Sequence, residues 1–132
     1  MKELAEKLRL VEQELSAERG RFEVFALLLR EDAPDVWDVV VAAPWASRDR
    51  FGAIQAVANK IQKELTPEEL TKLSRVVVLE KANSGLTAFH QAFSIEHGLA
   101  ELNNISLFGI PVKRGYVITS RRDQPPNQSV AG

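Results

Sequence analysis

The side chains best suited to bind a ligand lie in two short loops of this 132-residue chain, which combine serine, asparagine and cations. The first loop is residues 45–50 and the second is residues 81–85. Free backbone N–H groups at the start of a helix, together with arginine or lysine, attract phosphate and carboxylate groups. We therefore expect an anion-binding site. Its candidate residues are Ser47, Arg48, Arg50, Lys81, Asn83 and Ser84.

The order of the predicted elements brings these two loops to one edge of a sheet. Residues 36–43 and 75–80 are apolar runs typical of buried strands, and a helical pattern separates them. A parallel connection places the carboxyl ends of both strands at the same edge, where open α/β sheets bind ligands. In the alternative interpretation, Ser47 and Ser84 only cap their helices and the cations are solvated. Because no P-loop or GxGxxG motif is present, the sequence does not indicate a nucleotide.

A group of acidic residues suggests a second kind of chemistry, that of a metal-dependent nuclease. These acids are Glu31, Asp32, Asp35 and Asp38, with Glu80 and Lys81 on the next strand. Nucleases of the restriction-enzyme type pair a strand acid with an acid-x-lysine triplet, and this chain departs from that pattern. Glu80 and Lys81 are adjacent, so their side chains point to opposite faces of a strand. A metal-dependent, phosphate-handling enzyme is therefore only an alternative, and we expect no metal site and no cofactor.

Histidine, cysteine and serine patterns do not indicate an enzyme either. His90 and His97 are seven residues apart, which is ~10 Å along a helix and too far for one metal ion. The chain has no cysteine, which excludes thiol chemistry and disulfides. Ser84 lacks the preceding glycine of a GxSxG nucleophile turn.

The last predicted hairpin arm is basic. It carries Lys113, Arg114, Arg121 and Arg122 around the aromatic ring of Tyr116. Base stacking on Tyr116 with phosphate contacts from the cations would suit single-stranded nucleic acid. The alternative is an edge strand that its charge protects from aggregation. Pro111 indicates either an edge strand or a bulge. The net charge of −1 argues against a dedicated nucleic-acid binder.

The N-terminal segment has the apolar spacing of an amphipathic helix. Leu4, Leu8, Val11 and Leu15 are spaced by four, three and four residues, which is the seam of a short coiled coil. In a parallel dimer this register pairs Lys7 with Glu12 and Glu14 with Arg19. The four apolar residues are therefore candidates for dimerisation. The alternative is that the stripe packs on the sheet of its own chain, since two heptads are short for stable association.

The whole pattern predicts a single α/β domain, with a mixed sheet of about five strands, helices on its faces and an N-terminal amphipathic helix. Strands are expected at 22–29, 36–43 and 75–80, helices at 47–65 and from Thr66 onward, and a hairpin at 102–120. We divide the chain into a helix at 1–19, the α/β domain at 20–122 and a disordered tail at 123–132.

These features favour a non-enzymatic interaction or regulatory module, self-associating as a homodimer or binding another protein. The alternatives are the phosphate-handling enzyme and a nucleic-acid-binding module. The longest apolar run has eight residues, whereas a membrane span needs ~20, and no signal peptide is evident. We therefore expect a soluble, cytoplasmic protein with no membrane partner.

Overall fold

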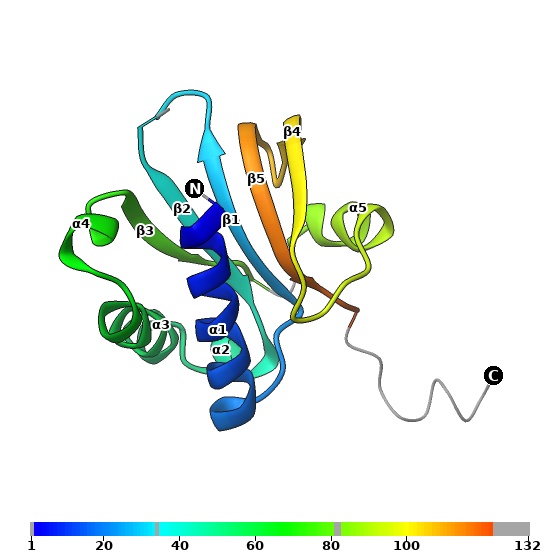
Figure 1. Ribbon diagram of the computed structural model, residues 1–132. Coiled ribbons are helices and arrows are strands. Elements are labelled where there is room, and N and C mark those ends of the chain that lie inside the picture. The colour runs from blue at the N-terminus through cyan, green and yellow to red at the C-terminus, as the bar shows by residue number, and fades with distance from the viewer. Residues whose placement is uncertain (1, 34, 81–82, 123–132) are drawn as a thin grey trace, which may run out of the picture.

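A computed structural model describes residues 2–33, 35–80 and 83–122 of the chain. One mixed sheet of five strands carries helices on both of its faces (Figure 1), which confirms the predicted α/β fold class. Lys81 and the predicted tail at 123–132 lie outside the described residues.

The strands follow the order β3-β2-β1-β5-β4 across the sheet. Their bounds are Val24–Arg30 for β1, Trp37–Ala42 for β2, Leu73–Val78 for β3, Ala100–Leu107 for β4 and Ile110–Ser120 for β5. The pairing of β2 with β3 is parallel, as predicted, and the other three pairings are antiparallel.

Of the two interpretations of Pro111, the edge strand is wrong, because β5 lies between β1 and β4. The bulge is present, because the register with β1 shifts between Leu29 and Arg30 and leaves Lys113 as an extra residue on β5. Pro111 is tolerated there since it is the second residue of the strand, one position before the register with β1 begins at Val112. It needs no N–H toward β1, and its carbonyl accepts a hydrogen bond from the N–H of Glu31 at 3.1 Å.

The helices are α1 (Lys2–Arg19), α2 (Pro44–Arg48), α3 (Arg50–Glu64), α4 (Pro67–Leu70) and α5 (Gly85–Ala92). The predicted helix at 47–65 is thus two helices, and Ser47 lies inside α2 instead of capping a helix. Asp49 interrupts the helix and caps α3, because its side chain accepts a hydrogen bond from the N–H of Gly52. The predicted start at Thr66 is confirmed by a capping box between Thr66 and Glu69.

Helix α1 packs on the sheet of its own chain, which overturns the predicted dimer seam. Leu4, Leu8, Val11 and Leu15 are each at most 3% exposed and belong to the core between α1, α3 and the sheet. Figure 1 shows α1 lying across that face of the sheet. Burying each such side chain contributes about 1.5–3 kcal/mol, and packing within one chain carries no cost of association. Self-association through this stripe would require α1 to leave the core.

A β-bulge near the end of β5 decides which side chains face α1. Val117 pairs with Ala26, whereas Thr119 pairs with Phe25, so Ile118 is an extra residue on β5. Ile118 therefore shares the α1 face of the sheet with Thr119, which bonds to α1, while Ser120 bonds toward α5 on the other face. Strict alternation would have placed Thr119 on the α5 face.

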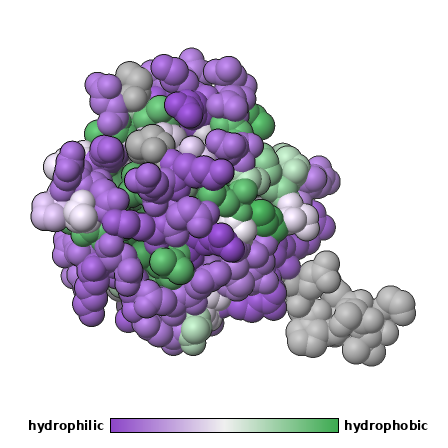
Figure 2. Space-filling view, viewed as in Figure 1, coloured by the Kyte–Doolittle hydropathy of each residue, from purple (hydrophilic) through white to green (hydrophobic). Residues whose placement is uncertain are grey.

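The outer surface on the α1 side is largely hydrophilic, with hydrophobic side chains in separate small areas (Figure 2). In the described part of the chain, no helix is long and apolar enough to cross a membrane.

Candidate functional site

The two predicted anion-binding loops leave the sheet toward opposite faces. Residues 44–50 form α2 and the start of α3 on the α1 face, whereas Asn83 and Ser84 lead into α5 on the other face. The side chains of Ser47, Arg48 and Arg50 are exposed. The parallel strands end at one edge as expected, but the two crossovers that follow them run over different faces. Ser47, Arg48 and Arg50 therefore lie on the opposite side of the sheet from Asn83 and Ser84, the described candidates of the second loop.

The start of α5 has no serine cap of the predicted kind. Ser84 occupies the N-cap position, but its side chain makes no capping hydrogen bond there. The side chain of Asn83 accepts a hydrogen bond from the N–H of Gly85 at 2.8 Å instead. Asn83 and Ser84 therefore form the turn that leads into α5.

Arg48 belongs to a different site, which we call the arginine groove. It is a hollow of about 330 Å³ lined by Arg19, Gly20, Arg21, Pro44, Trp45, Arg48 and Arg121. The arginines come from the end of α1, the link to β1, the end of α2 and the residue after β5. Sequence reasoning did not connect Arg19 and Arg21 with Arg48, because only the packing of α1 beside α2 brings them to one surface.

Trp45 fixes the geometry of the groove. Its indole N–H donates to the carbonyl of Gly20 at 2.9 Å, and its ring packs edge-on against Phe22 at 5.5 Å between centroids. The guanidinium of Arg19 lies 5.9 Å from the centre of the indole. Gly20 has a φ of +127°, and an added Cβ would lie 3.1 Å from the Trp45 ring, so a glycine is needed at this close approach.

The Glu96 carboxylate contacts two arginines of the groove. Glu96 accepts two hydrogen bonds from Arg21, at 2.9 and 2.7 Å, and lies 3.8 Å from Nε of Arg121. The hydrogen bond from Arg21 is the main cause that lowers the pKa of Glu96. Within the described residues, Arg48 forms no ion pair and remains exposed. The described lining of the groove contains four arginines and no carboxylate.

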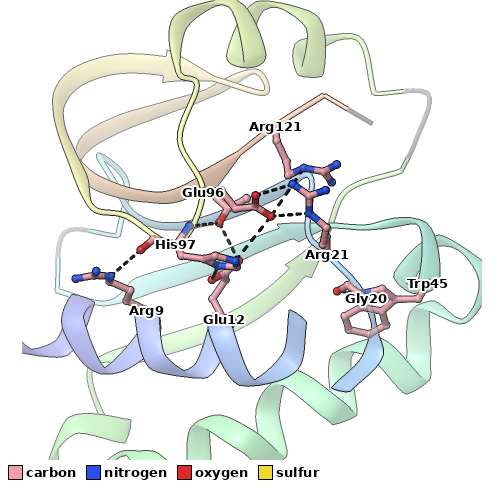
Figure 3. Close-up of polar contacts among 9 residues, drawn as sticks. Arg9, Glu12, Gly20, Arg21, Trp45, Glu96, His97 and Arg121 are labelled. Carbon is pink, nitrogen blue, oxygen red and sulfur yellow. Dashed lines mark hydrogen bonds and ion pairs between the residues drawn. The ribbon is translucent and has the colours of Figure 1, made fainter. Parts of the chain in front are cut away.

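Beside Glu96 lies a buried polar network that joins α1 to β5 (Figure 3). The Glu12 carboxylate is fully buried, with one oxygen 2.6 Å from Nδ1 of His97 and the other accepting a hydrogen bond from Thr119 Oγ1 at 2.8 Å. Its two oxygens therefore have partners, as a buried carboxylate requires. The coiled-coil register predicts a pair between Glu12 and Lys7 across a dimer, but Lys7 bonds to Glu69 of α4.

His97 is held at several points. Its N–H donates to Thr119 Oγ1 at 3.2 Å, and its carbonyl accepts from Nε of Arg9 at 2.7 Å. These bonds hold it at a φ of +57°, which is uncommon for a residue other than glycine. Because Nδ1 faces Glu12, Nε2 faces the groove side, 3.8 Å from Glu96. The backbone and the ring are thus both fixed.

The described residues give little support to the metal-dependent nuclease or to the nucleic-acid-binding module. Asp38 is buried between Arg30, at 2.9 Å, and Arg75, at 3.3 Å, so it serves an ion-pair cluster. Residues 2–33, 35–80 and 83–122 contain no group of three or more side chains able to hold a metal ion. Tyr116 is only 4% exposed and packs against Trp37, so it is not a platform for stacking bases.

Comparison with family models, with curated proteins and with solved structures found no match to this chain. Its function is therefore inferred from the geometry of the site.

Proposed function

We propose that this protein is a non-enzymatic interaction module that binds an anionic group of a partner protein in the arginine groove. The observation that carries the proposal is that four arginines from separate segments line one hollow. Planar guanidinium groups bind carboxylate and phosphate through paired hydrogen bonds, which makes arginine the preferred residue for such recognition.

The chemistry of the lining favours binding over catalysis. In its described lining, every polar side chain is an arginine or the indole of Trp45, and these groups only donate hydrogen bonds. The indole N–H already donates to the carbonyl of Gly20, so the arginines are the donors for a ligand. A donor-only surface complements a ligand that only accepts hydrogen bonds, which is the character of a carboxylate or a phosphate. The lining offers no side chain suited to act as a nucleophile or a general base.

The partner binds at the arginine groove and not at the apolar stripe of α1. Because Leu4, Leu8, Val11 and Leu15 are buried in the core, we do not propose a homodimer joined through α1. The nuclease and nucleic-acid alternatives have less support, since Asp38 is bound by two arginines and Tyr116 is buried.

The test compares phosphate with chloride at equal ionic strength in thermal unfolding. Phosphate should raise the melting temperature of the wild type more than chloride, and the double variant Arg19→Gln/Arg48→Gln should lose that specific gain. Excluded salts also stabilise proteins without binding. The matched control is therefore Lys113→Gln/Arg114→Gln, which removes two exposed cations near the other end of β5 and should keep the gain. Equal gains in all three proteins would contradict the proposal.

A further inference from the structure

The carboxylate of Glu96 sits in a ready-made anion site of the chain. Arg21 binds both of its oxygens, at 2.9 and 2.7 Å, and Arg121 and Nε2 of His97 each approach it to 3.8 Å. These groups come from three separate segments of the chain, and two of them also line the arginine groove. Figure 3 shows the carboxylate at the centre of this arrangement.

We propose that Glu96 is an internal occupant of a phosphate site, and that the phosphoryl group of a phosphate monoester replaces its carboxylate at Arg21 and Arg121. This inference rests on the proposed function, because the same two arginines belong to the groove. It specifies a phosphate monoester as the ligand and identifies Glu96 as a side chain of the same chain that competes with it.

The side chain of Glu96 can leave without unfolding its segment. The residues on either side are bound to β5, with two hydrogen bonds between Ile95 and Ser120, at 3.1 and 2.7 Å, and one from Gly98 to Ile118 at 3.0 Å. Rotation about the side-chain bonds of Glu96 therefore moves its carboxylate away from Arg21 while the backbone stays in place. The side chain of Glu96 is already 25% exposed, so its carboxylate has a path to water.

The donor geometry suits a phosphate better than a carboxylate. A carboxylate offers two oxygens, which Arg21 already binds, whereas a phosphate monoester offers three terminal oxygens. The third oxygen faces Arg121 and His97. Nδ1 of His97 lies 2.6 Å from the carboxylate of Glu12, so Nε2 is the ring nitrogen on the Glu96 side, 3.8 Å from its carboxylate.

The test is calorimetric titration with phenyl phosphate at pH 7.5, with benzoate as the carboxylate of the same shape. The variant Glu96→Gln keeps the size of the side chain and removes its charge. It should bind phenyl phosphate at least about tenfold more tightly than the wild type, the scale of one charge-assisted hydrogen bond. Benzoate should bind more weakly than phenyl phosphate to both proteins.

The matched control is Asp32→Asn, which removes one negative charge from another exposed ion pair with an arginine, Arg30, at 3.1 Å. It should bind like the wild type, which separates a local effect from the change in net charge.

A measurement on the wild type tests the inference even if the variants do not fold. The NMR resonance of the Arg21 Nε–H should shift as phenyl phosphate replaces Glu96. If the wild type binds phenyl phosphate with no shift at Arg21, or Glu96→Gln binds no more tightly, Glu96 is a structural ion pair and only this inference fails. If neither protein binds either anion, the proposed function fails with it.

Discussion

Thr119 and Ser120 are neighbours on β5, and each bonds to a different histidine on a different face of the sheet. Thr119 Oγ1 accepts from the N–H of His97 and donates to Glu12 on the α1 face. Ser120 Oγ lies 3.0 Å from Nδ1 of His90 and donates to the carbonyl of Phe93 on the α5 face. Both residues are fully or almost fully buried.

The two histidines nevertheless have opposite electrostatic surroundings. His97 contacts a buried carboxylate, whereas His90 forms no ion pair with a carboxylate in the described part of the chain. Burial is the main cause that lowers the pKa of His90, followed by the charges of Arg122 and Arg121. Thr119 and Ser120 point to opposite faces because they are adjacent on a strand, and the bulge at Ile118 makes Thr119 the one that faces α1.

The largest effect is expected from Thr119→Val, which keeps the shape of the side chain and removes its hydroxyl. The change leaves one oxygen of Glu12 and the N–H of His97 without a partner. Each buried group left unsatisfied costs about 1–3 kcal/mol, so the free energy of unfolding should fall by about 3 kcal/mol. Urea unfolding followed by circular dichroism measures this change.

A smaller effect is expected from Ser120→Ala on the other face. This variant loses the hydrogen bond to Phe93 and the contact with His90, neither of which involves a buried charge. The expected loss is about 1 kcal/mol by the same measurement. Similar losses for Thr119→Val and Ser120→Ala would mean that the carboxylate does not distinguish the two faces.

The smallest effect concerns the pH dependence of stability at His90. Its pKa in the folded protein is lowered from about 6.5 in the unfolded chain, so the unfolded state binds the proton more readily. Above pH 6.5 both states are neutral at this residue. Stability should therefore decline as the pH falls below 6.5 toward the folded pKa.

The variant His90→Gln removes this titration. Its free energy of unfolding should decline less than that of the wild type between pH 7.5 and 5.5. Parallel curves for the two proteins would show that His90 has the same proton affinity in the folded and unfolded chains.

Much of the fold could be predicted from local patterns, because each is read within a few residues. The spacing of Leu4, Leu8, Val11 and Leu15 predicted α1, and the Thr66 to Glu69 capping box predicted the start of α4. The apolar runs predicted the parallel pair β2 and β3. The spacing did not determine the packing partner of the α1 stripe, because the same apolar side chains can be buried in a coiled coil or against a sheet.

The candidate site could be predicted only in part. Arg48 was identified from its loop, but Arg19, Arg21 and Glu96 were not, because they meet through the packing of α1, α2 and the segment before β4. Glu12 was assigned to a surface pair, since a charged residue beside an apolar stripe is usually solvated. Its burial depends on two partners more than 80 residues away along the chain.

The sequence by itself determined the order and type of the elements, because hydrophobic periodicity and capping act over one or two turns. Only the tertiary structure decided the functional surface. One extra residue in β5 turns Thr119 toward α1, and that turn gives Glu12 a donor and brings it to His97. A bulge depends on the pairing between β1 and β5, which join residues some 90 positions apart, so no local pattern in the chain encodes it.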